Sequence, residues 1–556
     1  MYEQVFDPVG DSLGLSAIFA VLPLLTLFVL LGGFKLKAYV AGLASLAVAI
    51  VVAVAVYSMP VGQALLSSSE GAVFGLFPIM WIVINAIWLY NMTVKTGHFA
   101  VLRRAFGSVS DDQRIQAVLV AFAFGALIEG LAGFGTPVAI TAVMMIALGF
   151  APLKAAALAL IGNTAPVAFG SIATPIITLA ETTGLDKADL GAMVGRQTPL
   201  LALIVPLVLV FVVDGARGLR QTWPAAIVAG FFFALAQFVC SNYISVELTD
   251  IIGALAALGA TVLFLRFWRP SEPLLGERSP DPGPRPAMAG AATHDPVFET
   301  ELRRRDQEQD SGREVFEAFA PYLIIVAVFA LAQLGPIKDA LAGPTQEFAW
   351  PGLDVVNPDG EAVSSATFRF NWLAAAGTLM FVCGVLTMLM LRFNPGRALR
   401  TYGETLRQLG PAILTVMAVL ALAYVMNQSG QTITLGQWAA GAGGIFAFFS
   451  ALIGWLGVAV TGSDTSSNAL FGGLQVEAAK QAGESSLLLA AANSSGGVLG
   501  KMISPQNLAI CAAAVGMAGQ EGDIFRRVLG WSVVLVLIMA VLVYLQSTAV
   551  LGWMVP

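Results

Sequence analysis

Charged side chains are scarce in this sequence. Asp, Glu, Lys and Arg supply 12% of its 556 residues, whereas 57% of the residues are hydrophobic. Soluble globular domains carry about twice that share of charge. The composition therefore excludes the soluble classes and is typical of a protein that crosses a membrane several times. The formal net charge is only −6, and nothing in the sequence suggests nucleic acid as a partner.

Cysteine and histidine are also rare. Cys240, Cys383 and Cys511 lie far apart in apolar runs, and the two histidines do not cluster. Neither a disulfide framework nor a metal site has this spacing. The sequence also lacks a P-loop, a dinucleotide-binding fingerprint, a zinc motif and a nucleophile elbow in a credible context. We therefore expect no metal, no cofactor and no enzymatic activity.

The sequence is rich in apolar runs of about 20 residues, the length that a helix needs to cross a bilayer. Pro60–Gly71 is too short and polar to cross, and we place it at the membrane interface. Together with the interrupted runs described below, the uninterrupted ones predict an all-α polytopic membrane protein with about 12 spans. The uninterrupted runs are 13–34, 38–57, 74–94, 193–213, 223–240, 248–267, 319–334, 372–391, 411–427 and 529–546.

Four other apolar stretches are interrupted by glycine, proline and polar residues. At membrane depth, irregular backbone is tolerated only where protein or a water-filled cavity satisfies the peptide groups. We interpret the first and third interruptions as tips of re-entrant hairpins, and the second and fourth as breaks in discontinuous transmembrane helices. The interruptions lie at Gly130–Pro137, Gly162–Pro175, Thr461–Ser467 and Asn493–Pro505.

A polar stretch rich in proline and arginine, 269–313, separates two apolar halves. Its composition cannot bury enough apolar surface to fold, which predicts a flexible linker. We divide the chain into a first repeat with two connecting spans (1–268), a flexible cytoplasmic linker (269–317) and a second, inverted repeat (318–556).

The two halves share a residue pattern at a fixed offset. Because the matches fall on corresponding elements, they indicate an internal repeat. The pairs separated by 330 positions are Asn163 and Asn493, Gly170 and Gly500, Thr174 and Ser504, and Pro175 and Pro505.

Loop charges predict the orientation of the repeats, because basic connections stay in the cytoplasm. The basic connections contain Lys35 and Lys37, 95–114, 217–220, the linker, 392–407 and 526–527. The N-terminus and the connections with Glu70, Glu181, Glu247, Asp354 and Glu361 are acidic and would face outward. An odd number of spans then separates the repeat starts. The repeats are therefore inverted, and both hairpin tips approach one site at the midplane.

Broken helices present amide and carbonyl termini at such a site, which suits a small carboxylate as the substrate. Short polar side chains would bind the carboxylate and a neighbouring hydroxyl, and glycines would let the backbone approach. The substrate-binding candidates are Lys501, Asn163, Thr164, Ser171, Thr174, Asn493, Ser494, Ser495, Ser504, Gly135, Thr136, Ser463 and Thr465.

Three ionisable residues lie in the interrupted stretches. An ionisable side chain at membrane depth is a functional candidate by default. Lys501 would neutralise the substrate carboxylate, or else snorkel or pair with a structural acid. Glu129 is a candidate proton carrier because burial favours the neutral carboxyl, or else it makes a structural hydrogen bond or is the partner of a basic side chain. Asp464 is a second proton candidate, or else a helix cap.

Three long motifs resemble the bacterial lactate permease family, and the similarity extends over nearly the whole chain. They are GALIEGLAGFGTPVAIT (Gly125–Thr141), TGSDTSSNALFGGLQ (Thr461–Gln475) and GKMISPQNLAIC (Gly500–Cys511). The resemblance implies uptake of lactate and related 2-hydroxymonocarboxylates such as glycolate, coupled to protons, across the bacterial inner membrane. It also implies kinship with the ion-transporter superfamily of inverted-repeat carriers. The residues alone indicate only a carrier of a small anion.

We expect an alternating-access symporter in which a proton on Glu129 or Asp464 accompanies an anion held by Lys501. The lipid bilayer and a small carboxylate are then the partners. The oligomeric state stays open. Three other functions also stay open: a sodium-coupled (di)carboxylate carrier of the same superfamily, an anion channel, and an intramembrane enzyme.

Overall fold

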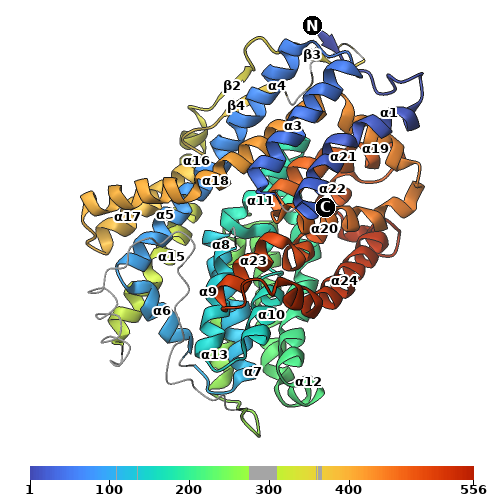
Figure 1. The fold of residues 1–556 in the computed structure, drawn as a ribbon. Coiled ribbons are helices and arrows are strands. Elements are labelled where there is room, and N and C mark those ends of the chain that lie inside the picture. The colour runs from blue at the N-terminus through green and yellow to red at the C-terminus, as the bar shows by residue number, and fades with distance from the viewer. Residues whose placement is uncertain are drawn as a thin grey trace.

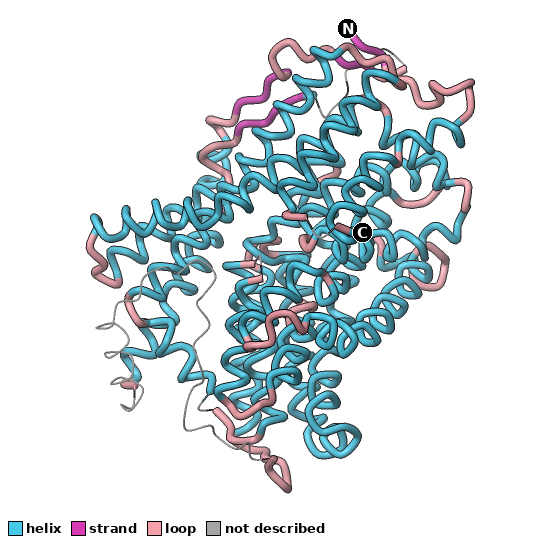
Figure 2. The backbone as a smooth tube through the Cα atoms, viewed as in Figure 1, coloured by secondary structure: helices cyan, strands magenta, loops and turns pink. Residues whose placement is uncertain are grey.

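The structure is a computed structural model that describes residues 1–556 except 35, 108, 134, 275–309, 333, 359, 361–362 and 364–365. Helices make up most of the described residues, and the few short strands gather at one end of the molecule (Figure 2). Most of the predicted linker, including its central proline-rich part, lies outside the described residues.

The first half contains α1 to α13, joined by short π-helical and 3₁₀ turns. Their bounds are α1 Leu13–Ala20, α2 Leu22–Phe28, η1 Val29–Gly33, α3 Ala38–Ala55, α4 Val61–Phe74, η2 Gly75–Met80, α5 Trp81–Lys95, α6 His98–Gly107, α7 Gln113–Gln116, η3 Ala117–Phe124, α8 Gly125–Ala132, α9 Thr136–Ala147, α10 Pro152–Gly162, η4 Val167–Phe169, α11 Gly170–Thr183, α12 Lys187–Tyr243 and α13 Thr249–Leu265.

The second half begins within the predicted linker range, because α15 starts at Gly312. Its elements are α15 Gly312–Ala332, α16 Gly335–Ala342, β2 Gln346–Ala349, β3 Val355–Val356, β4 Thr367–Phe370, α17 Ala376–Met390, α18 Pro395–Gln428, α19 Gln431–Ala440, η6 Gly443–Ile445, α20 Phe446–Thr461, α21 Asp464–Ala482, α22 Ser486–Gly500, η7 Lys501–Ile503, α23 Pro505–Ala514, α24 Glu521–Gln546 and η8 Gly552–Met554.

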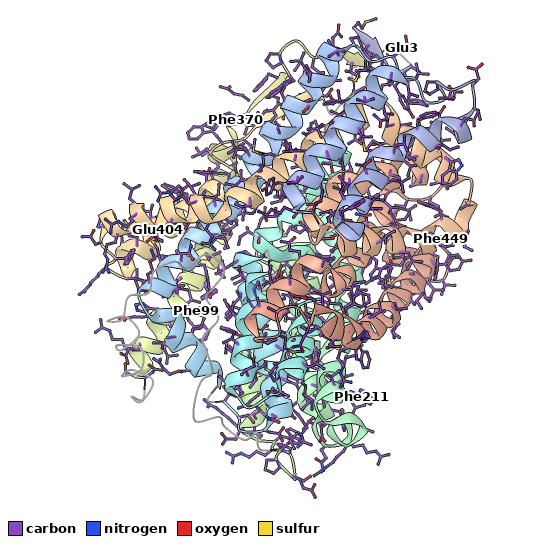
Figure 3. All side chains as sticks on the ribbon, in the orientation of Figure 1. Glu3, Phe99, Phe211, Phe370, Glu404 and Phe449 are labelled. Atoms are coloured by element: carbon purple, nitrogen blue, oxygen red, sulfur yellow. The ribbon has the colours of Figure 1, made fainter. Side chains whose placement is uncertain are left out.

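Nine helical stretches among the described residues are long and apolar enough to cross a membrane, or ten if the bent pair α10 and α11 forms one span. The predicted fold class, an all-α polytopic membrane protein, is therefore confirmed. Exposed aromatic side chains such as Phe211 and Phe449 suit lipid contact, and Figure 3 labels both near the edge of the molecule. Helix α12 loses helical geometry at Asp214 and Gly215, between the two spans that the sequence separates.

The segment Pro60–Gly71 differs from the sequence interpretation. It lies mostly in α4, which continues through a break at Phe77 into α5 and packs against α3 and α18. A Cβ atom on Gly71 would lie 2.5 Å from the carbonyl oxygen of Leu420. Glycine therefore allows the close backbone approach that buries this helix, although its composition is polar.

The two halves place their elements in the same order. In the first half, α8, a glycine turn, α9, α10, a break and α11 precede α12. In the second half, α20, a glycine turn, α21, α22, a break and α23 precede α24. Contacts between the halves are reciprocal, because α11 packs on α21 as α23 packs on α9, and α12 packs on α22 as α24 packs on α10 (Figure 1). These contacts support the internal repeat, whose inversion remains a prediction.

Two small sheets lie at the end of the molecule where the chain begins (Figure 1). Strand β1 (Tyr2–Glu3) pairs in parallel with β3, and β2 pairs antiparallel with β4. The hydroxyl of Tyr2 donates to the carbonyl oxygens of Tyr57 and Ser429. The N-terminal segment therefore ties the two halves together at the end that the loop charges place outside.

A buried arginine connects several segments at the opposite end of the molecule. Arg114 pairs with Asp112 at 2.7 Å and with Asp214, at the α12 break, at 3.1 Å. It also donates to the carbonyl oxygen of Glu272. One guanidinium thus joins α7, the α12 break and the residues that lead into the linker. Arg217 and Gln221 lower the pKa of the exposed Glu272 by donating hydrogen bonds to its carboxylate.

Candidate functional site

Two helices are broken where the sequence predicts. Helices α10 and α11 meet at 64°. Within the break, Ser171, Ile172 and Ala173 have φ values of 46°, 57° and 55°, a left-handed conformation that side chains with a Cβ disfavour. In the other half, α22 ends in the short 3₁₀ turn η7, and the Ser504 side chain then caps α23. Both breaks lie inside the protein.

The first break and the second one meet at an ion pair. Lys501 Nζ lies 2.6 Å from Glu129 Oε1, and the side chains are only 7% and 3% exposed. Asn163 Nδ2 donates to the other carboxylate oxygen, Glu129 Oε2, at 2.9 Å. Glu129 is therefore held from both halves of the chain, by the α10 end and by the η7 turn.

Glycines make room for this carboxylate. A Cβ atom on Gly170 would lie 2.6 Å from Glu129 Oε1, and one on Gly133 would lie 2.6 Å from Ser171 Oγ. The Gly133 amide donates to Ser171 Oγ at 2.9 Å. The first glycine turn is therefore joined directly to the first break, as the sequence analysis expects of a shared site.

A second polar cluster surrounds Asp464. Ser494 Oγ donates to Asp464 Oδ2 at 2.6 Å, whereas Asp464 Oδ1 has no hydrogen-bond partner among the described residues. Asn493 Nδ2 donates to Asn468 Oδ1 at 2.9 Å. Asp464 is the first residue of α21, but Ser463 supplies the side-chain cap of this helix. The carboxylate of Asp464 therefore points into the polar cluster instead of capping the helix.

The remaining candidates divide into three groups. The hydroxyls of Thr164, Thr174 and Ser504 donate to nearby backbone carbonyls of their own segments. Thr465 and Ser495 are buried, and Ser495 Oγ has no partner in the described part of the chain. Gly135, Thr136 and Ser463 line a cavity of about 1960 Å³.

This cavity, which we call the vestibule, is lined by residues of both glycine turns and of α5, α18, α9 and α23. Its lining includes five basic side chains and two acidic ones. Figure 3 labels one of the acids, Glu404, on the arm formed by α17 and the start of α18. The vestibule thus brings three of the candidate residues into one cavity with the basic segments that the loop charges place in the cytoplasm. The charged lining residues are Lys37, Lys95, Arg397, Arg400, Arg407, Glu404 and Glu521.

Two buried groups near the ion pair have unsatisfied hydrogen-bonding capacity. Asn163 Oδ1 has no partner among the residues described, and neither carboxylate oxygen of Asp250 has one. Asp250 interacts electrostatically with Glu129 and Lys501. Sequence reasoning missed Asp250 because it lies at the start of an ordinary apolar helix, after a loop that the loop charges place outside. The charge on that helix was the only signal that could have singled it out.

The described residues contain no group of three or more His, Cys, Asp or Glu side chains able to hold an ion. The three cysteines are buried and unpaired.

Comparisons with known proteins agree over the full chain. A family model described as L-lactate permease matches residues 16–550. The chain is 43% identical to an L-lactate permease of Escherichia coli (strain K12) over 568 residues, and 40% identical to one of Bacillus subtilis (strain 168) over 575 residues. It is also 40% identical to the glycolate permease GlcA of Escherichia coli (strain K12) over 570 residues. The alignments cover 100% of this chain and 99–100% of each relative.

Proposed function

The chain belongs to the L-lactate permease family, and from this premise we propose that it takes up lactate and related 2-hydroxymonocarboxylates such as glycolate. We place it in the bacterial inner membrane as a proton symporter that works by alternating access. The relatives are named permeases for lactate or glycolate, which favours a carrier over an enzyme.

The observation that carries this proposal is the buried ion pair between Lys501 and Glu129. Lys501 is the cation available to a substrate carboxylate at the junction of the two broken helices. Its ammonium already holds one carboxylate at 2.6 Å, so the chemistry of the site suits a second carboxylate in the same place. A substrate anion would compete with Glu129 for Lys501.

Charge balance then couples the anion to a proton. If the substrate takes Lys501 while Glu129 stays ionised, an unpaired carboxylate remains buried, which is strongly unfavourable. Protonation of Glu129 removes this charge. The empty site (Lys501 with ionised Glu129) and the loaded site (Lys501 with the substrate anion, Glu129 protonated) then carry the same net charge. One proton therefore accompanies each anion.

This coupling also suits uptake into a cell. An inside-negative membrane potential opposes entry of one negative charge by about 2.3 kcal/mol per 100 mV. A proton that travels with the anion cancels this opposition. Transport is then electroneutral and is driven by the proton gradient.

Recognition of the 2-hydroxyl group is assigned to Asn163. Its amide nitrogen is occupied by Glu129, and its oxygen Oδ1 has no partner in the described structure. A substrate hydroxyl could donate to this oxygen while the carboxylate binds Lys501. A site built to bind a hydroxyl rejects an analogue without it, because a buried polar group is then left unpaired.

Alternating access requires a site that is open to only one side of the membrane at a time. The vestibule is lined by residues of both glycine turns and by the basic segments that the loop charges place in the cytoplasm. We interpret this as the inward-open state, in which a bound anion would leave into the cytoplasm. Movement of α9, α21 and the broken helices against α5 and α18 would close this route and open the outer one.

The test is uptake of labelled lactate by the full chain in proteoliposomes. An outside-acid pH gradient should drive accumulation, and Glu129→Gln, which imitates the protonated side chain, should abolish accumulation yet keep exchange of lactate across the membrane. Accumulation driven by a sodium gradient, with no response to the proton gradient, would contradict the proposal.

Competition between labelled lactate and unlabelled carboxylates tests which substrates the protein accepts. Unlabelled lactate and glycolate should inhibit uptake of labelled lactate, whereas propionate, which lacks the 2-hydroxyl, and a dicarboxylate should inhibit weakly. Asn163→Ala should reduce the preference for lactate over propionate. Strong inhibition by the dicarboxylate would instead favour a dicarboxylate carrier.

A further inference from the structure

Asp250 is a fully buried carboxyl group that the proposed mechanism has not used. The residue is 0% exposed, and neither of its carboxylate oxygens has a hydrogen-bond partner in the described parts of the chain. Unpaired carboxylates are rare inside proteins, because a buried charge without a partner is strongly unfavourable. Asp250 therefore needs either a proton or a cation.

The position of Asp250 links the ion pair to the outer loop between α12 and α13. Helix α13 packs against α8, which carries Glu129. A Cβ atom on Gly130, the residue after Glu129, would lie 3.2 Å from Asp250 Cβ. Asp250 also comes three residues after Glu247, which lies in the loop between α12 and α13. The loop charges place this loop outside.

The loop itself holds an ionised acid. Burial raises the pKa of Glu247, but the charge and the hydrogen bond of Lys187 outweigh burial, so that the pKa is lowered. Lys187 is 42% exposed, and this pair therefore lies next to solvent. Asp250 is the next carboxyl along the chain after Glu247 and, unlike it, has no hydrogen-bond partner among the described residues.

Among the described residues, the charges around Asp250 leave no second cation for it. The described ionisable groups that interact with it are Glu129 on α8, Lys501 at the end of α22 and the Cys240 thiol on α12. The single ammonium among them, Lys501, donates to Glu129. Two carboxyl groups share one cation, and protonation of one of them neutralises the cluster.

We propose that Asp250 holds a proton and relays it between the outer loop and Glu129. This inference rests on the proposed proton symport. In the step, the O–H bond of Asp250 breaks as the group gives its proton to a bridging water, and that water gives a proton to Glu129, which forms an O–H bond and releases Lys501 for the substrate. The carboxylate of Asp250 then takes a proton from the outer side. No electrons are transferred, and water is the only other reactant.

A structural alternative makes a different prediction. Asp250 lies in the first turn of α13, where a carboxylate also stabilises the helix through its dipole. Asp189 lies in the first turn of α12 in the same way, but it is exposed. Asp189→Asn is therefore a matched control, which removes the same charge from the same helical position away from the ion pair.

The experiment compares two transport modes of the purified full chain in proteoliposomes. Net lactate uptake driven by an outside-acid gradient requires protonation and deprotonation in every cycle. Exchange of labelled for unlabelled lactate at equal pH does not require release of the proton. For Asp250→Asn we expect net uptake to fall about 100-fold, with exchange unchanged. Asp250→Glu should restore net uptake, and Asp189→Asn should behave like the unmodified protein.

The outcomes separate this inference from the proposed function. If the unmodified protein does not respond to the pH gradient, the proposed symport fails before any variant is measured. If it responds but Asp250→Asn transports normally, the relay is overturned and symport stands. Equal loss of both transport modes in a folded Asp250→Asn protein also overturns the relay, because it indicates a structural role. If Asp250→Asn does not fold, the smaller Asp250→Ser variant takes its place in the same comparison.

Discussion

Each member of the Lys501 and Glu129 pair depends on the other, because both side chains are almost completely buried. Removing one partner of a buried pair leaves an isolated charge, which is far more unfavourable than the pair itself. Asn163 alone cannot replace the ammonium, because it offers Glu129 a single neutral donor. At the scale of residues, the stability of the protein therefore depends on the same contact as its proposed function.

Lys501→Met should destabilise the protein by about 3–5 kcal/mol at neutral pH. Thermal unfolding in detergent measures this difference. Lys480→Met, which removes an exposed lysine at the end of α21, should change little. A Lys501→Met protein as stable as the unmodified one at neutral pH would show that the pair is not buried.

Gly170→Ala should destabilise the protein by about 1–3 kcal/mol, because the new methyl group would lie 2.6 Å from Glu129 Oε1. It should also impair proton-driven uptake by displacing Glu129 from Lys501. Gly530→Ala is the control, since its Cβ atom would meet no described atom within 4 Å and alanine favours the α24 helix. Similar unfolding temperatures for the two variants would contradict the packing at Gly170.

The sequence predicted which of these residues are functional candidates, but it did not predict their partners. Lys501 and Glu129 stand out because ionisable residues are unusual in apolar runs. They are 372 positions apart, and only the packing of the two halves brings them together. The hydroxyls of Thr164 and Thr174 looked like substrate ligands, yet in the structure they donate to backbone carbonyls, an arrangement that broken helices favour.

At the scale of elements, the α10 and α11 break is the least regular part of the fold. Three consecutive residues, Ser171–Ala173, adopt the left-handed conformation, which costs about 1–2 kcal/mol per residue for side chains with a Cβ. Such strain persists only where surrounding contacts impose it. The Gly133 amide, which donates to Ser171 Oγ, is one of these contacts. The break is therefore a natural place for movement during transport.

Ala173→Gly should stabilise the protein or leave its stability unchanged, since glycine adopts a left-handed conformation without strain. The same substitution at Ala180, in the regular part of α11, should destabilise it by about 1 kcal/mol. Thermal unfolding of the two variants compares one chemical change in two backbone conformations. Equal destabilisation by both would mean that residue 173 is helical.

The types of the elements and the positions of the breaks were predictable from the sequence. The length of an apolar run indicates a span, and glycine or proline within the run indicates a break. The two spans within α12 and the broken α10 and α11 pair follow the sequence boundaries closely. The burial of α4 was not predictable, because it depends on the close approach of Gly71 to α18. That contact joins residues of different halves, and local composition does not report it.

At the scale of the whole molecule, the vestibule gives the site a route with a positive charge. Its basic side chains include Arg400 and Arg407, which lie on α18 and line the vestibule. Clefts lined by one sign of charge raise the local concentration of the opposite ion, and salt weakens this effect. In the proposed inward-open state, a lactate anion should therefore be concentrated in the vestibule.

The variant Arg400→Gln with Arg407→Gln should weaken binding of cytoplasmic lactate and reduce its dependence on ionic strength. Efflux from proteoliposomes, followed at several internal lactate and salt concentrations, measures both. Arg266→Gln, which removes an exposed cation outside the vestibule, serves as the control. An unchanged salt dependence in the double variant would show that these arginines do not act on the substrate.

Family membership was predictable from three motifs, and the full-length matches confirm it. The division of the chain at 269–317 and the inverted orientation of the repeats remain predictions. The division rests on composition and the orientation on loop charge, and the central part of the linker lies outside the described residues.

The most direct test of the central claim is to measure lactate and proton movement together in the same proteoliposomes. The exchange of partners at Lys501 predicts one proton for each lactate, uptake driven by the pH gradient, and no change when a potassium diffusion potential is imposed. Lactate uptake without proton movement, or uptake that responds to the potential and not to the pH gradient, would contradict it.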